Sequence, residues 1–283
     1  MHGQLLGLQQ RQWLVIRNIL PSIYHKLFPE AILDFAIKET KATCDNCALS
    51  NGKSPDHRNY QAHLKCCTFH PFQTNYLIGQ ILLTPTTPKE VLERIRAKIE
   101  NREYALPIGI VAPMPHQIKF SKRKDNEFGN REDWLCPYYD RKRNNCGIWK
   151  SRSSVCTSFH CLSNYGSAGF EFWDQLSDYI SYVEMALMEE ALLQLDFTPM
   201  EISDQLSFLN PEGQSSSRKR KQFLTHEFTR EVWKGYLDDQ EAFYKQCYEI
   251  VANFSEKQFK KALGNPGIVI QKKLMTAKNA VIL

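Results

Sequence analysis

The sequence predicts a mainly α protein, with at most minor strands, in which an irregular cysteine-rich unit is braced by helices. Two stretches carry apolar residues at helical spacing, one over residues 88–101 and one over residues 173–187. Between and before them, cysteines are dispersed through a region rich in turn-forming residues. We therefore expect three segments: a helical segment over 1–39, the cysteine-rich unit over 40–165, and a helical extension over 166–283.

The N-terminal segment is predicted to be helical up to the first cysteine. Pro29 stands at a plausible first-turn position, and Ile32, Phe35 and Ala36 follow at helical spacing. The polar residues 48–63 are expected to form a loop inside the cysteine-rich unit.

A helix over about 88–101 follows a capping box in which Thr87 and Glu90 flank Pro88 and Lys89. Its apolar face consists of Val91, Leu92, Ile95 and Ile99. The short apolar runs 77–83 and 106–111 fit either strands or buried helical turns, because periodicity does not separate these alternatives in so few residues.

The helical extension begins acidic and ends basic. Residues 171–212 contain ten acidic side chains and no Lys, Arg or His, which with their apolar stripe indicates an acidic amphipathic helix. Residues 214–221 are polar and are predicted to be a linker. Two further helical stripes follow, one with Phe228, Val232 and Tyr236 and one with Phe243, Ile250 and Phe254, and Gly264 with Pro266 is expected to stop a helix.

Length and composition leave room for a genuine core. With 283 residues and 42% hydrophobic content, the chain does not need a metal to compensate for small size. Its first residues lack a charged region followed by a small-residue cleavage site, so we expect no signal peptide, no membrane span and a cytoplasmic location. In that reducing compartment its nine cysteines are available for metals or catalysis rather than for disulfides.

Eight of the nine cysteines fall in two blocks. The first has a C-x2-C pair, eighteen further residues and an adjacent pair, and the second has gaps of nine, nine and four residues. Soft thiolates select zinc, cuprous copper or iron–sulfur clusters over hard cations. The sequence therefore predicts a metal centre with these ligands: Cys44, Cys47, Cys66, Cys67, Cys136, Cys146, Cys156 and Cys161. Cys247, in a C-terminal helix far from both blocks, is expected to be a core residue.

The second block also contains other residues in a recurring order. Cys136-Pro137-Tyr138-Tyr139-Asp140 is followed by Cys146-Gly147-Ile148-Trp149, then Arg152 and Val155-Cys156. This order resembles the YkgJ-like cysteine-cluster family of zinc- or iron-chelating domains, over roughly residues 40–165. Two features depart from the family pattern: eighteen residues precede the double cysteine where the family has only a few, and Ser153 stands where a proline commonly follows the arginine.

Two metals fit the donor set. A single C-x2-C hook with widely spaced further cysteines favours an iron–sulfur cluster, whereas eight cysteines could equally supply two zinc sites with four thiolates each. An imidazole could replace a thiolate, and the candidates are His57, His63, His70 and His160.

Three functions remain open at this stage. The first is a metal-chelating protein, binding an iron–sulfur cluster or zinc, whose reaction is unknown. The second is a cluster-dependent protein-modifying enzyme, because one relative implied by the resemblance is flagellin lysine N-methylase; no nucleotide-binding glycine-rich turn supports it. The third is an interaction protein with a zinc-stapled fold and a protein partner. The formal charge of +5 does not indicate a nucleic-acid partner. Residues 119–152 contain more basic than acidic side chains, and this excess is explained locally, because positive charge offsets the negative charge of nearby thiolates.

Overall fold

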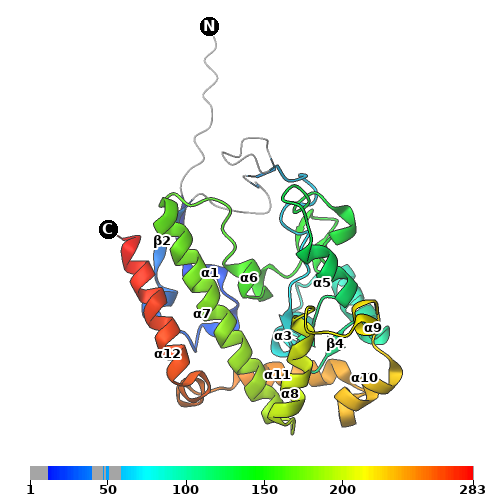
Figure 1. Cartoon of the computed structure of the whole chain (residues 1–283). Helices are drawn as coiled ribbons and strands as arrows, with labels where there is room; N and C mark the ends of the chain where they lie inside the picture. Colours follow the sequence, from blue (N-terminus) through cyan, green and yellow to red (C-terminus); the bar gives the residue numbers. More distant parts are fainter. Residues whose placement is uncertain (1–11, 40–46, 48, 51–58, 283) are drawn as a thin grey trace.

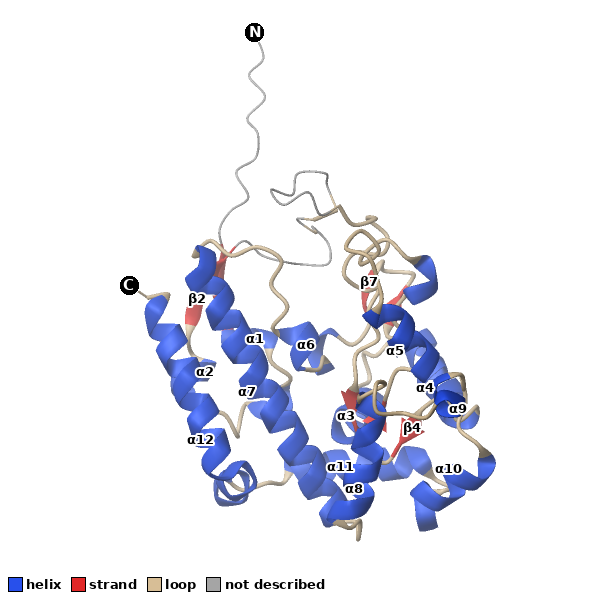
Figure 2. Ribbon diagram, viewed as in Figure 1, coloured by secondary structure: helices blue, strands red, loops and turns tan. Residues whose placement is uncertain are grey.

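The computed structural model describes residues 12–39, 47, 49–50 and 59–282, and over these the protein is mainly α with minor strands, as predicted. Figures 1 and 2 show the helices. The α-helices are α1 (Ile16–Ile19), α2 (Glu30–Leu33), α3 (Asn75–Leu83), α4 (Lys89–Glu100), α5 (Met114–Ser121), α6 (Ser154–Thr157), α7 (Gly166–Leu193), α8 (Pro199–Leu206), α9 (Ser216–Lys219), α10 (His226–Trp233), α11 (Gln240–Ala252) and α12 (Glu256–Ala280). Short 3-10 turns are η1 (Ser22–Tyr24), η2 (Glu132–Trp134), η3 (Trp149–Ser151), η4 (Ser207–Leu209) and η5 (Lys234–Tyr236).

The strands form three small antiparallel sheets. They are β1 (Gln12–Val15), β2 (Ala36–Glu39), β3 (Gln73–Thr74), β4 (Ala105–Leu106), β5 (Gly109–Ile110), β6 (Tyr139–Asp140) and β7 (Asn145–Cys146), paired as β1-β2, β3-β5-β4 and β6-β7. Of the two apolar runs left open by the sequence, 77–83 is therefore helical and 106–111 belongs to a hairpin. That hairpin needs Gly109, because its φ is +133° and a Cβ there would lie 2.1 Å from the carbonyl oxygen of Gln73.

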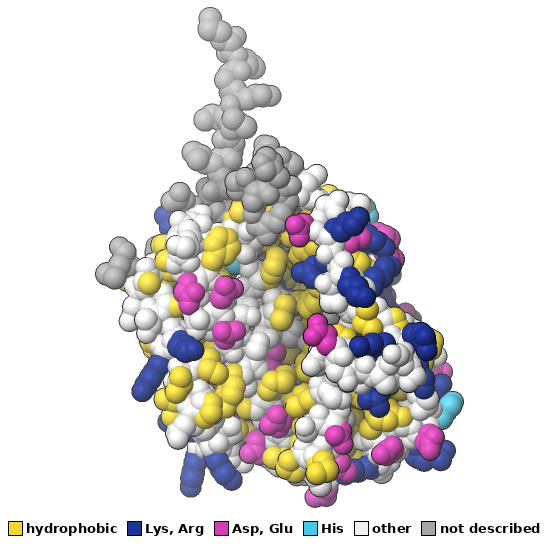
Figure 3. Space-filling model, in the orientation of Figure 1, with side chains coloured by type: hydrophobic (Ala, Val, Ile, Leu, Met, Phe, Trp, Pro, Cys, Tyr) yellow, Lys and Arg dark blue, Asp and Glu magenta, His cyan; other side chains and the backbone are white. Residues whose placement is uncertain are grey.

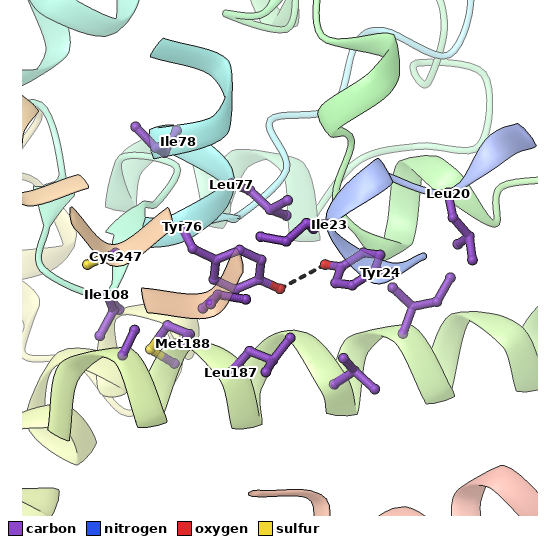
Figure 4. Close-up of a cluster of buried hydrophobic side chains, with 14 of the residues drawn as sticks. Leu20, Ile23, Tyr24, Tyr76, Leu77, Ile78, Ile108, Leu187, Met188 and Cys247 are labelled. Atoms are coloured by element: carbon purple, nitrogen blue, oxygen red, sulfur yellow. Dashed lines mark hydrogen bonds between the residues drawn. The ribbon is translucent and has the colours of Figure 1, made fainter. Parts of the chain in front are cut away.

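Two helix pairs organise the interior. The long helix α7 lies beside α12, and α3 packs on α11 (Figure 1). One buried apolar cluster contains side chains from Ile16 to Val281, so the N-terminal and C-terminal segments contribute to the same core. At its centre the hydroxyls of Tyr24 and Tyr76 are 2.7 Å apart, beside Leu187 and Met188 of α7 (Figure 4).

The prediction of a helical N-terminal segment is wrong for the described residues 12–39. Its two ends pair as β1 and β2, with Val15 opposite Ala36, and only short helical turns lie between them. Pro29 does precede a helix, but α2 ends after four residues because the chain then turns into β2. Ile32 and Leu33 are buried there, so the apolar spacing reflects burial in a turn followed by a strand.

The helix predicted near 88–101 is confirmed as α4, with Val91 and Ile95 buried. The capping box is wrong, because Pro88 occupies the N-cap position and no side chain caps the helix. The Thr87 hydroxyl instead donates to the Ile81 carbonyl at 2.9 Å, and Glu90 accepts from the backbone N–H of Arg141 at 2.9 Å. Both polar groups are used to join α4 to neighbouring segments.

The C-terminal half is helical, with two differences from expectation. Gly264 has φ +56° and ψ −164°, so it kinks α12, but helix resumes and runs to Ala280. The segment 214–221 contains the short helix α9, and Arg218 lies over the ring of Phe208 at 4.8 Å, so this segment packs on the rest of the protein. In the described part of the chain, no helix combines the length and apolarity that crossing a membrane requires.

Candidate metal centre

The adjacent cysteines Cys66 and Cys67 sit at the end of a tight turn. Leu64 and Lys65 donate their backbone N–H groups to the carbonyl of Gln61, at 2.9 and 2.8 Å, and Lys65 adopts a left-handed φ of 55°. The N–H of Cys67 then bonds the Leu64 carbonyl at 3.1 Å. This compact turn holds the two consecutive cysteines, Cys66 and Cys67, at one place in the fold.

The β6-β7 hairpin brings the second block to that turn. The N–H of Cys136 donates to the carbonyl of Cys67 at 2.8 Å, which joins the two cysteine blocks directly. Tyr139 pairs with Cys146 across the hairpin, and the Asp140 carboxylate accepts from the N–H groups of Lys142 and Arg143 at 2.9 and 3.1 Å. The aspartate of the sequence motif therefore holds the hairpin turn.

Arg152, the arginine of the motif, braces the segment that carries Cys156. Its guanidinium donates to the carbonyls of Trp149 and Cys156, at 3.2 and 2.9 Å, and lies 3.6 Å from the centre of the Trp149 ring. Ser153 is the N-cap residue of the short helix α6, and its carbonyl accepts a hydrogen bond from the Cys156 N–H at 3.0 Å.

The thiols of five cysteines influence one another electrostatically. Burial raises the pKa of Cys136 and of Cys156, and the negative charges of Cys146 and Cys66 raise both further. The pKa of Cys67 is raised by the hydrogen bond to Cys66, by burial, and by the charges of Cys66, Cys136 and Cys146. We call the sulfur-bearing residues Cys66, Cys67, Cys136, Cys146 and Cys156 the five-cysteine cluster.

Cys66 is the member whose thiolate is favoured. The hydrogen bond from Cys67 lowers its pKa to about 7, against the opposing effect of burial, and the positive charges of Arg152 and Lys65 lower it further. A thiolate is the form that binds a metal, so one sulfur of the cluster is prepared for coordination near neutral pH.

The remaining predicted ligands lie in different surroundings. Cys161 is buried in a small apolar cluster with Leu49 and Tyr60, and both Cys47 and Cys66 pack against it. Cys44 lies outside the described residues. Cys247 is fully buried in the main core, as its position in the sequence predicted.

The donor chemistry of the five-cysteine cluster fits a thiophilic metal, because soft sulfur ligands select zinc, cuprous copper or iron–sulfur centres. No disulfide joins two of the described cysteines. Within the described ranges, however, no three His, Cys, Asp or Glu side chains form a group arranged to hold a metal ion. The cysteines thus share one region of the fold without forming a closed ligand shell there.

The histidines considered as substitute ligands have other contacts. His63 is exposed and its Nε2 lies 3.2 Å from the Glu132 carboxylate, and His160 stacks on Trp173 with ring centres 4.2 Å apart. His70 is buried beside the ring of Tyr138, at 6.1 Å between centres. His57 falls in a part of the chain that the structure leaves undescribed.

Arg94 is a supporting residue that the sequence analysis missed. It projects from α4 and donates to the carbonyls of Pro137, at 2.6 Å, and of Tyr139. These bonds hold the chain on either side of Tyr138, directly after Cys136. No local sequence signal marks this role, because an arginine on a helix is ordinarily a solvated side chain.

Comparisons with known proteins do not assign the chain to a family: no family model matches it, and neither does any curated protein or solved structure. The resemblance to YkgJ-like proteins therefore stays a prediction from the motif.

Proposed function

We propose that this protein binds a metal, as an iron–sulfur cluster or zinc, through thiolates of the five-cysteine cluster. The observation that carries the proposal is the backbone hydrogen bond from Cys136 to Cys67, which joins two cysteine blocks about seventy residues apart in the chain. The thiols of both blocks raise one another's pKa, as expected of sulfur atoms gathered in one region. Gathering five half-buried thiols in one region is costly for their charged forms, and a bound cation would offset that cost.

The surrounding residues have supporting roles in this proposal. Cys66 would contribute the first thiolate, because its pKa is already lowered to about 7. Arg152 and Lys65 supply positive charge that partly neutralises a multi-thiolate site. Arg94 and Asp140 hold the loop and hairpin that carry Cys136 and Cys146. When bound, an iron–sulfur cluster would supply electron transfer, and zinc would supply structural crosslinking or Lewis acidity.

The test is anaerobic purification followed by a visible spectrum and by measurement of iron, zinc and acid-labile sulfide. We expect a stoichiometric metal; brown colour with sulfide would identify a cluster, and colourless protein with zinc would identify a thiolate zinc site. The decisive variant is Cys136→Ser, which should lose the metal, compared with Cys247→Ser, which removes a thiol from the core and should retain it. A folded wild-type protein that neither carries nor takes up iron or zinc would contradict the proposal.

A further inference from the structure

A pocket opens between α4, α5, η2 and the residues that follow η2. Its volume is about 500 Å³, within the range of small-molecule sites, and its lining includes His70, Lys98, His116, Lys119, Trp134 and Pro137. Pro137 directly follows Cys136, and the negative charge of Cys136 acts on Lys98. The pocket is therefore next to the five-cysteine cluster but is lined by different side chains.

The wall of the pocket contains an unusually buried cation. The side chain of Lys98 is only 8% exposed, and its ammonium lies 3.0 Å from Glu103, which is 25% exposed. Burial lowers the pKa of Lys98, so its charged form is costly and gains from any further anion that approaches. Lys119, also in the lining, pairs with Asp133 at 2.5 Å.

The charges of the lining favour an anion. Lys98 and Lys119 are paired with Glu103 and Asp133. Arg94 adds a positive charge to the lining; its hydrogen bonds go to backbone carbonyls, and the nearest oxygen of its ion-pair partner Glu90, a residue outside the lining, is 3.9 Å away. On the face shown in Figure 3, Lys and Arg side chains gather over the lobe that carries α5. A net positive charge in a concave, poorly solvated site attracts oxyanions.

Two imidazoles in the lining bear on which ligands the pocket can hold. The Nδ1 of His70 is 3.2 Å from the Pro71 carbonyl, which only accepts, so Nδ1 carries the proton and Nε2 of the neutral ring is an acceptor. Nε2 of His70 and Nε2 of His116 are both buried and have no hydrogen-bond partner among the described residues. Burial and the charge of Lys98 lower the pKa of both rings. Burial and the charge of Lys98 oppose a proton at these nitrogens and oppose a divalent cation as well, so two close histidines do not make this a metal site. The acceptor Nε2 of His70 does not hold the oxyanion itself and would instead accept a hydrogen bond from a donor elsewhere on the ligand.

We propose that this pocket binds a small molecule through an oxyanion group, carboxylate or phosphate, held by Lys98 and Lys119. The oxyanion would give the buried ammonium of Lys98 a second charged partner. Trp134, whose ring is buried in the lining, supplies an apolar wall for the remainder of the ligand. The proposal concerns binding alone and does not depend on the metal.

Isothermal titration of the purified full-length protein with inorganic phosphate and, separately, with malonate tests the pocket. We expect saturable binding of at least one probe below about 10 mM. Binding of phosphate alone would indicate a phosphorylated ligand, and binding of malonate alone would indicate a carboxylate ligand. Binding of both would indicate a site that recognises the oxyanion group they share. No saturable heat with either probe would overturn the proposal.

Two variants locate the binding. Lys98→Met keeps the length of a side chain that is already buried, and it should weaken binding about tenfold or more, since a charged hydrogen bond is lost. Lys119→Gln changes a half-exposed side chain, which keeps the test valid if Lys98→Met does not fold. The control is Lys122→Gln, an exposed lysine at the end of α5 outside the lining. Equal affinities in wild type, Lys119→Gln and the control would place the anion elsewhere and refute the assignment.

Discussion

Glu184 accepts hydrogen bonds from both the backbone N–H and the hydroxyl of Ser154, at 2.8 and 2.9 Å. Ser154 begins helix α6, which carries Cys156, and Glu184 lies in the middle of α7. The Tyr24 hydroxyl donates to the same carboxyl at 3.3 Å. One buried acid therefore joins the cysteine-bearing segment to the main helix of the core.

This carboxyl should make stability depend on pH. Burial, as the largest cause, raises the pKa of Glu184 to about 8, although its three hydrogen bonds act against that rise. The unfolded chain releases this proton near pH 4.5 and the folded chain only near pH 8, so the free energy of unfolding should fall across that interval. At about 1.4 kcal/mol per pKa unit, the loss amounts to several kcal/mol.

The variant Glu184→Gln should remove most of that dependence, because the amide stays neutral at every pH and keeps acceptor and donor atoms near Ser154 and Tyr24. Urea unfolding at several pH values between about 5 and 8 measures the slope. Asp178→Asn, an exposed position on the same helix, is the control and should leave the slope of the wild type. A Glu184→Gln protein with an unchanged slope would show that this carboxyl is not the source.

A second prediction concerns thiol reactivity in the metal-free protein. Cys66 has a pKa lowered to about 7, whereas those of Cys136 and Cys156 are raised. Because the thiolate is the nucleophile, iodoacetamide at pH 7 should alkylate Cys66 faster than the other two, which peptide mass spectrometry can follow.

The variant Cys67→Ala should slow that reaction, since the hydrogen bond from Cys67 is the largest cause of the low pKa of Cys66. Cys247→Ala removes a buried core thiol instead and should leave the rate at Cys66 unaltered. If Cys136 or Cys156 reacted first, the proposed order of acidities would be wrong.

A third prediction tests Arg94 as a positioning residue. Lysine cannot bond the carbonyls of Pro137 and Tyr139 together with one planar group, so Arg94→Lys should loosen the chain that follows Cys136. Hydrogen exchange should speed up at the Gly147 N–H, which bonds Tyr138, and metal retention should fall. Arg96→Lys changes a half-exposed arginine on the same helix that is paired with Glu241, and it should change neither. Equal exchange in both variants would remove Arg94 from this role.

The sequence predicted the helices well where a long amphipathic stripe met buried partners, as at Val91 and Ile95 of α4 or Leu176 and Val183 of α7. It failed over 12–39, where apolar spacing that resembles a helix belongs to short turns between paired strands. Strand pairing joins residues far apart in the chain, and local periodicity does not record it.

Lys98 and Glu184 are buried charged residues that stand within these helical stripes. Lys98 follows Ile95 by three positions, and Glu184 follows Ile180 by four, so both stand on core-facing sides of their helices. A charged residue at such a position is a signal of a buried ion pair, a ligand site or a shifted pKa. Local sequence patterns do not predict that Cys66 and Cys136 are neighbours. The backbone hydrogen bond between Cys136 and Cys67 brings their segments into contact, and it joins residues far apart in the chain.

The last prediction concerns the close contact of α3 with α11. Gly79 permits it, because a Cβ there would lie 2.0 Å from the Tyr244 carbonyl oxygen and 2.8 Å from the Tyr248 Cβ. Both obstacles are backbone or the base of a side chain, and neither can rotate away. The variant Gly79→Ala should therefore push the helices apart and lower the free energy of unfolding by at least about 2 kcal/mol, measured by urea denaturation.

Gly235→Ala is the matched control for that helix contact. A Cβ at Gly235 meets nothing within 4 Å, and its φ is not in the left-handed region, so this change should alter stability by no more than about 0.5 kcal/mol. Because Tyr244 also donates its hydroxyl to the Leu106 carbonyl at 2.8 Å, moving α11 would disturb the β4-β5 hairpin as well. A Gly79→Ala protein as stable as the control would mean that the two helices can separate without loss, contrary to the packing described.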